Sequence, residues 1–226
     1  MEILEVIIMS DNLRKTEEFY REKLGLIVLK NSKNSISFKA GRSVLTFLKS
    51  KALDPVYHFA FNIPKNQIHE AVTWASLKLD LLNSEDNHVI ADFENWNAKS
   101  FYFLDNNGNI LEFIARADLD NESHTPFNST SIISISEFGL VTDNVAETAQ
   151  KLRSNYGIPL FDKQPVLKNF AAAGDDEGLL ILSTTGRNWY PTNIPVQGFY
   201  SRIKLHEAEK TLEIETDVLP RFSNSP

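Results

Sequence analysis

The stretch of sequence that decides the fold is Ser100-Phe-Tyr-Phe-Leu-Asp-Asn-Asn-Gly-Asn-Ile-Leu-Glu-Phe113. Its middle, Asp105 to Asn109, holds residues that tolerate positive φ, and both flanks are aromatic or branched. The pattern therefore predicts two strands joined by a tight turn. Alternation in the second strand places Glu112 on one face with Ile110 and Ile114. A carboxylate among apolar residues is costly to bury unless it is paired, hydrogen-bonded or bound to a metal. Glu112 is therefore the first candidate for a functional residue.

Within residues 1–116, which include this hairpin, a pattern of one strand, one helix and several strands occurs twice. In the first copy, Asn12 is a suitable N-cap for a helix that begins at Leu13 and ends before Gly25. The second copy contains a strand in which His58, Ala60 and Asn62 share one face. The predicted first-copy strands are 3–9, 26–30, 35–40 and 43–48; the second copy has a strand at 57–63, a helix at 66–77 and strands at 87–93, 99–104 and 110–116.

A third copy of the pattern follows a polar segment, 117–130, that lacks periodicity and is predicted to be a linker. Adding 132 to the residue number carries Glu5 to Glu137, Asn12 to Asn144 and Gly25 to Gly157. The third unit should therefore repeat the first. Its helix is expected at 145–156 and its strands near residue 160, at 169–173 and at 179–183. A strand predicted at 199–205 lacks the chain length for a full fourth unit.

Composition sets the class of protein. The chain has 226 residues, no cysteine and a formal net charge of −7 without long runs of one sign, which argues against a nucleic-acid partner. No apolar run approaches the ~20 residues that span a bilayer, so we expect no membrane partner. Acids stand near the N-terminus where a signal peptide has bases, so a cytoplasmic location is expected. Without cysteine, any metal must be held by His and carboxylates.

These units resemble the vicinal oxygen chelate superfamily of glyoxalase, bleomycin-resistance and extradiol dioxygenase proteins. The resemblance rests on Asn12-Leu13, Phe19-Tyr20 and Leu24-Gly25 in the first unit and on the 100–112 hairpin in the second. It implies an α+β fold in which paired βαβββ units form a cup-shaped mixed sheet. We accordingly expect a paired domain at 1–116, a linker at 117–130, and a third βαβββ unit with a C-terminal tail at 131–226.

The resemblance also implies a metal site in the first-domain cup. The family's ligand positions fall on Glu5, His58 and Glu112, and the optional fourth position falls on Thr46. One imidazole and two carboxylates would suit Mn, Fe, Zn or Mg. Glu5 and Glu112 are also the acid–base candidates. We assign substrate contacts to Thr46 and to Tyr102, which alternates toward the Glu112 side of its hairpin.

Each of these residues also has a structural interpretation. A strand histidine such as His58 is often a satisfied structural residue. Glu5 could simply face solvent beside Arg or Lys, and it also stands where the family usually has His or Gln. Glu137 has no recognisable partners in the third unit and is interpreted as inherited structure. The aromatic loop Arg187-Asn-Trp-Tyr-Pro-Thr192, with its one cation, could cover a ligand or pack on the surface of the third unit, and surface packing is the favoured interpretation.

Two functions remain open on these grounds. The first is a divalent-metal-dependent enzyme, of lyase, isomerase or dioxygenase type, that acts on a small oxygenated substrate. The second is a metal-free protein of the bleomycin-resistance kind, which binds a small molecule between aromatic walls. A third unit without a partner would leave a sheet edge uncovered, so a homodimer is expected unless residues 199–216 close that sheet.

Overall fold

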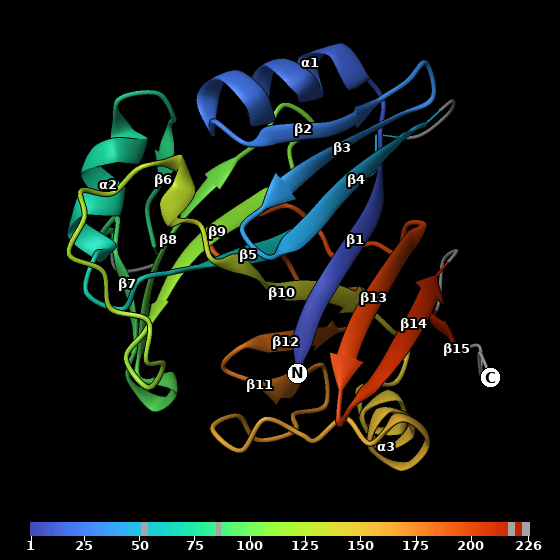
Figure 1. The fold of residues 1–226 in the computed structure, drawn as a ribbon. Coiled ribbons are helices and arrows are strands. Elements are labelled where there is room, and N and C mark those ends of the chain that lie inside the picture. The colour runs from blue at the N-terminus through green and yellow to red at the C-terminus, as the bar shows by residue number, and fades with distance from the viewer. Residues whose placement is uncertain (51–53, 85–86, 217–219, 223–226) are drawn as a thin grey trace.

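A computed structural model of the chain describes residues 1–50, 54–84, 87–216 and 220–222. Two mixed sheets dominate it (Figure 1). One sheet has the strand order β15-β14-β13-β1-β4-β3-β2, and the other has the order β11-β12-β10-β5-β9-β8-β6, with β7 paired to β8. The α+β class, with βαβββ units in curved mixed sheets, is thus confirmed.

The first unit comprises β1 (Glu2–Ser10), α1 (Leu13–Glu17), which continues as the π-helical turn η1 (Glu18–Lys23), β2 (Ile27–Asn31), β3 (Ser35–Ala40) and β4 (Ser43–Lys49). The second comprises β5 (His58–Ile63), α2 (Ile68–Ser76), β6 (Leu81–Leu82), β7 (Ala91–Phe93), the 3-10 turn η2 (Glu94–Trp96), β8 (Ala98–Leu104) and β9 (Ile110–Arg116). In both units the last long strand pairs in parallel with the first.

The third unit follows η3 (Ser129–Ser131) and comprises β10 (Ser134–Val141), α3 (Val145–Tyr156), β11 (Phe170–Asp175) and β12 (Gly178–Ser183). The strand expected near residue 160 is reduced to one bridge between Leu160 and Ala173. The chain then forms β13 (Ser201–Glu207), β14 (Lys210–Thr216) and β15 (Pro220–Phe222). Beyond Phe222, the expected 131–226 unit lies outside the described residues.

The first and third units share their local structure as well as their sequence. Asn12 and Asn144 both cap a helix, through side-chain oxygens that accept a hydrogen bond from the backbone N–H three residues later. Gly25 and Gly157 follow these helices with the same φ of 72°, a left-handed conformation that suits glycine. The prediction that one strand-helix unit was reused is confirmed at these positions.

The pairing of the units differs from the expectation. β5 of the second unit pairs antiparallel with β10 of the third, while β1 of the first unit pairs antiparallel with β13. The first and second units therefore lie in different sheets. Their strands do not pair with each other as the expected paired domain at 1–116 would require. Strand pairing crosses the expected boundary because the third unit supplies the antiparallel partner that covers the edge of β5.

All strands of both sheets come from one chain, so the argument for a homodimer from an unpaired third unit no longer holds. The tail covers the edge of β1, not that of the third unit. A homodimer stays a prediction without that support. Among the described residues, no helix is both long and apolar enough to cross a membrane.

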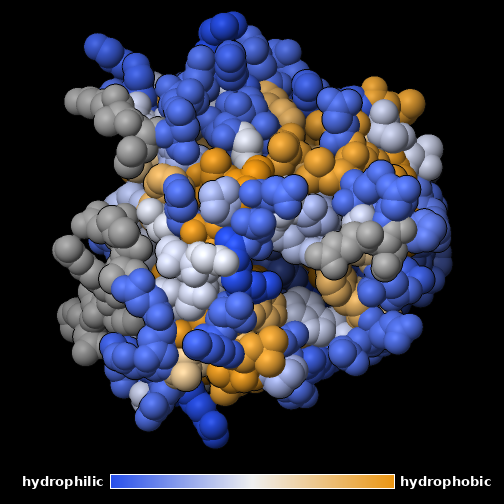
Figure 2. All heavy atoms as spheres, turned by 180° about the vertical axis from the view of Figure 1, so that it is seen from behind, coloured by the Kyte–Doolittle hydropathy of each residue, from blue (hydrophilic) through white to orange (hydrophobic). Residues whose placement is uncertain are grey.

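The core lies between the sheets and under the helices. Each helix packs on strands of its own unit (Figure 1). One continuous cluster of buried apolar side chains includes residues of both sheets and of all three units, among them Ile8, Phe47, Phe61, Phe113 and Phe138. Seen from behind (Figure 2), the surface is largely hydrophilic, with apolar patches around a central hollow.

The 100–113 hairpin forms as predicted. Asp105 accepts hydrogen bonds from the backbone N–H groups of Asn107 and Asn109, and the hydroxyl of Tyr20 in the first unit donates to it. Gly108 supplies a φ of 80° in the turn. The turn thus fixes the hairpin register and also joins the second unit to the first, because a buried carboxylate needs all of these donors.

Candidate metal centre

Three candidate ligand side chains gather around β5, the strand at the junction of the second and third units. Ala60 of β5 is in register with Glu112 of β9 on one side and with Glu137 of β10 on the other. His58 lies two residues before Ala60 and therefore points to the same face. The two glutamates therefore flank Ala60, one on each neighbouring strand.

The three side chains are buried and close together. Their exposed fractions are 7% for His58, 2% for Glu112 and 3% for Glu137. The Nε2 atom of His58 is 3.7 Å from Oε2 of Glu112 and 4.0 Å from Oε2 of Glu137. One possible ligand atom from each residue lies within 4.8 Å of the others.

The imidazole is held in one orientation. Nδ1 of His58 is 3.1 Å from the carbonyl oxygen of Ile110. Because a carbonyl only accepts, Nδ1 carries the proton and donates, which leaves the lone pair of Nε2 directed toward the two carboxylates. Metal-binding histidines are typically oriented by such a bond from the other ring nitrogen.

Burial controls the charges of this cluster. It lowers the pKa of His58 to about 4, although the Ile110 carbonyl opposes the change, so the imidazole is neutral at pH 7. Burial, followed by repulsion from Glu137, raises the pKa of Glu112 to about 8 despite the nearby Ser100 and Tyr102 hydroxyls and Arg116. Burial also raises the pKa of Glu137, and Arg116 opposes this rise.

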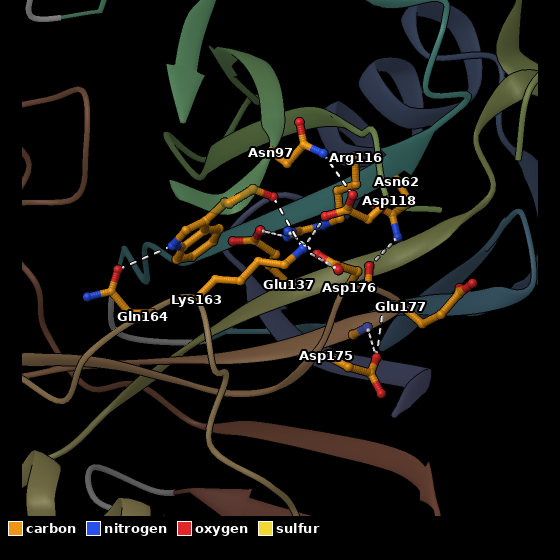
Figure 3. Close-up of polar contacts among 12 residues, drawn as sticks. Asn62, Asn97, Arg116, Asp118, Glu137, Lys163, Gln164, Asp175, Asp176 and Glu177 are labelled. Atoms are coloured by element: carbon orange, nitrogen blue, oxygen red, sulfur yellow. Dashed lines mark hydrogen bonds and ion pairs between the residues drawn. The ribbon is translucent and has the colours of Figure 1, made fainter. Parts of the chain in front are cut away.

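Arg116, at the end of β9, connects the cluster to a chain of charges (Figure 3). Its guanidinium is fully buried and donates through Nη2 to Glu137 and through Nη1 to Asp176, the latter at 3.3 Å. Lys163 continues the chain with bonds of 2.6 Å to Asp176 and 2.7 Å to Asp118. One glutamate of the cluster is therefore charge-compensated by protein, whereas Glu112 has no such direct partner among the described residues.

The cluster opens into a cavity of about 520 Å³, which is within the range for small-molecule sites. Aromatic side chains form much of its wall: Phe93, Trp96, Tyr102, Phe170, Trp189 and Tyr190. The ring of Trp189 lies over His58, with centroids 5.5 Å apart. The 187–192 loop, expected to pack on the surface of the third unit, thus lines the cavity instead.

The sequence-predicted residues divide between two places. His58, Glu112 and Tyr102 all line this cavity. Glu5 and Thr46 lie in the other sheet, where the Thr46 hydroxyl donates to Glu5 at 3.2 Å. The expected convergence of Glu5 with His58 and Glu112 is therefore wrong, because β1 belongs to the sheet that excludes β5 and β9.

Glu137 takes the place that the sequence argument gave to Glu5. Both residues hold the same position in the repeat, and the local pattern around them is equivalent. The interpretation of Glu137 as inherited structure without partners is wrong, since it contacts Arg116 and approaches His58. The repeat could have indicated Glu137 from the sequence. The offset of 132 residues places Glu137 on the first strand of its unit, at the position that Glu5 holds in the first unit.

The donor set fits a divalent ion. Two ligands bound at ~2.1 Å on opposite sides of an ion are about 4.2 Å apart, so His58–Glu separations of 3.7 and 4.0 Å are compatible with one shared ion. A neutral imidazole and two carboxylates match the preferences of Mn, Fe, Zn or Mg. Because the pKa of Glu112 is raised to about 8, an ion bound there would displace the proton of that carboxyl.

Neither a protein-family model nor a curated protein matches the sequence. Solved structures do match the fold. A putative dioxygenase from Bacillus subtilis subsp. subtilis str. 168 is 16% identical, with 96% of this chain and 85% of that chain covered and a TM-score of 0.60. A glyoxalase I mutant from Zea mays is 15% identical over 81% of this chain and 68% of that chain, with a TM-score of 0.57.

A shorter protein matches about half of the chain. A glyoxalase/bleomycin resistance protein/dioxygenase from Nocardioides is 18% identical, with 55% of this chain and 89% of that chain covered and a TM-score of 0.44. The two longer alignments, together with the paired βαβββ units, show that this chain has the fold of the vicinal oxygen chelate superfamily.

Proposed function

We propose that the chain is a divalent-metal-dependent enzyme acting on a small oxygenated substrate in the 520 Å³ cavity. The observation that carries the proposal is the convergence of His58 Nε2 with carboxylate oxygens of Glu112 and Glu137 at the base of that cavity. A bound ion would supply Lewis acidity toward oxygen atoms of the substrate. Lyase, isomerase and dioxygenase chemistry all use such a site.

The protein groups have separable roles in this proposal. His58 presents a fixed lone pair, because Ile110 holds its other nitrogen. Arg116 keeps Glu137 in place through its guanidinium. Glu112, with a pKa raised to about 8 in the unliganded site, is the better candidate to exchange a proton with a ligand near neutral pH. Tyr102 lies beside it on the cavity wall.

Metal analysis of untagged protein tests the proposal. Calorimetric titration of chelator-treated protein with Mn²⁺ or Zn²⁺ should show one site per chain, and Glu137→Gln or Glu112→Gln should weaken it at least about 10-fold. Glu5→Gln is the matched control, since it removes an equivalent glutamate from the other sheet and should leave the affinity unchanged. Equal weakening by all three variants, or no binding by the wild type, would overturn the proposal.

The metal-free alternative remains a second candidate because of two features of the same cavity. Its walls are largely aromatic, and a Glu112 that carries a proton near neutral pH can donate a hydrogen bond to a ligand without any ion. A protein that binds no divalent ion but still binds an aromatic ligand in this cavity would establish this alternative.

A further inference from the structure

Arg187 contributes a cation to the cavity that the proposed metal chemistry does not use. It is half-buried and lines the cavity, and its guanidinium stands 4.7 Å from the ring centroid of Phe170. Its polar contact with the chain is a long one, 3.5 Å from Nη1 to the hydroxyl of Ser183. Burial without a nearby anion lowers its pKa.

The acids near this cavity do not neutralise Arg187. Asp92 pairs with Lys99 at 2.9 Å, and Glu137 pairs with Arg116. Glu94 and Glu112 also line the cavity, and neither forms an ion pair with Arg187. Within the described ranges, no carboxylate lies at ion-pair distance from the Arg187 guanidinium. A half-buried guanidinium offers several donors in a planar fork that matches a carboxylate, so the donors that Ser183 does not use are available to an anion.

Arg187 contacts Ser183, whose level on β12 is displaced along the strands from the cluster. The displacement is two residues from His58, which lies level with Gly139 and Ile181, and four residues from Glu137. Ser183 is four residues beyond Leu179 on β12, and Leu179 is in register with Glu137. At ~3.3 Å per residue, the Ser183 level is about 13 Å along the strand from the Glu137 level. Aromatic side chains form much of the wall of the same cavity, which favours a flat apolar ligand body there.

The loop that carries Arg187 is held in place. The backbone N–H of Val196 donates to the Arg187 carbonyl at 2.9 Å, and the N–H of Trp189 donates to Ile194 at the same distance. Trp189 itself is buried against His58. The guanidinium is therefore presented by a fixed backbone, as a preformed binding group would be.

We propose that Arg187 binds the anionic end of the cavity's ligand, and that this ligand is an aromatic carboxylate whose other end reaches the His58–Glu112–Glu137 cluster. The proposal rests on the proposed function only in taking this cavity as the ligand site. It does not require the ion, so the two can fail separately.

The test compares two probes of equal shape and different charge, 2-naphthoate and 2-naphthamide, by calorimetry on chelator-treated wild-type protein. Without an ion, the cluster holds a neutral His58, a Glu112 whose pKa of about 8 keeps its proton on near neutral pH, and a Glu137 paired with Arg116. Selection for the naphthoate charge therefore falls to Arg187, which has no carboxylate partner among the described residues. The wild type should bind naphthoate about 10-fold more tightly than naphthamide. Arg187→Gln should reduce that ratio to about 1, and Arg187→Lys should restore part of it.

Arg42→Gln is the matched control, because Arg42 is an exposed arginine paired with Glu177 and removing it changes net charge equally. It should keep the wild-type ratio. Circular dichroism of each variant checks that it is folded. Three outcomes would each overturn the Arg187 proposal. The wild type could bind naphthoate no better than naphthamide, it could bind neither probe in the low millimolar range, or Arg187→Gln could keep the wild-type ratio of affinities. A selective wild type that binds no Mn²⁺ or Zn²⁺ would instead overturn only the metal-dependent function.

Discussion

Replacement of Arg116 by Met should expose how the cluster depends on its one buried cation. Arg116 is fully buried, with its guanidinium carbon 5.6 Å from the centroid of the Trp96 ring. Met keeps the apolar stem of the side chain while removing the charge. Glu137 is then left with the neutral His58 and the acidic Glu112 as neighbours. Breaking a buried pair in this way costs about 3–5 kcal/mol of unfolding free energy.

For a chain of this length, that loss corresponds to a fall of about 6–20 °C in Tm. The assay is urea and thermal unfolding of chelator-treated protein at pH 7, followed by circular dichroism. The double variant Arg116→Met/Glu137→Gln should recover at least about 2 kcal/mol, since no carboxylate is left unpaired at position 137. The loss should also shrink toward pH 5, because Glu137 can then take up a proton.

The exposed pair Arg42–Glu177, 2.6 Å apart, is the matched control. Arg42→Met should cost less than about 1 kcal/mol, since solvent screens both charges. The reasoning would be refuted if Arg116→Met cost no more than this control. It would equally be refuted if the second substitution at Glu137 recovered nothing, because the loss would then come from packing and not from an unpaired charge.

Three further outcomes are expected. In the folded protein the pKa of Glu112 is about 8 and that of His58 is about 4. As pH rises, deprotonation of Glu112 in the unfolded chain lowers the unfolding free energy, whereas deprotonation of His58 in the unfolded chain raises it. The two effects oppose each other below about pH 6.5, and only the Glu112 effect remains above it. The stability of metal-free protein should fall from pH 6.5 to 8, by at most about 1.4 kcal/mol per pH unit, and Glu112→Gln should abolish this fall in urea unfolding. Gly139→Ala places a Cβ 2.6 Å from the Trp189 ring, so it should cost about 1–3 kcal/mol and shift tryptophan emission to longer wavelength. Asn144→Ala removes the cap of α3 and should lower the unfolding free energy by about 1 kcal/mol, measured by urea unfolding at constant pH.

Local sequence was sufficient to predict much of this molecule. The 105–109 turn is specified by residues that accept its backbone angles and by Asp105, whose oxygens bind the turn's own N–H groups. Strand alternation placed Glu112 on one face with Ile110 and Ile114, and His58 on one face with Ala60 and Asn62, while the family resemblance selected the two as candidate ligands. In the structure both side chains line the cavity. These features depend on neighbours within a few residues, so the sequence carries them directly.

The sequence did not determine which repeats pair with each other. That pairing decides which glutamate, Glu5 or Glu137, lies beside His58 and Glu112. Glu5 and Glu137 occupy the same position in equivalent units, so no local pattern distinguishes them. Their difference comes from β10, and not β1, forming the antiparallel partner of β5. That choice depends on contacts between segments more than 70 residues apart and on how each free strand edge is covered. The tertiary structure therefore supplied Glu137 and its Arg116 partner, and it moved the Arg187 loop onto the cavity, whereas the sequence supplied His58, Glu112 and the repeated unit that carries them.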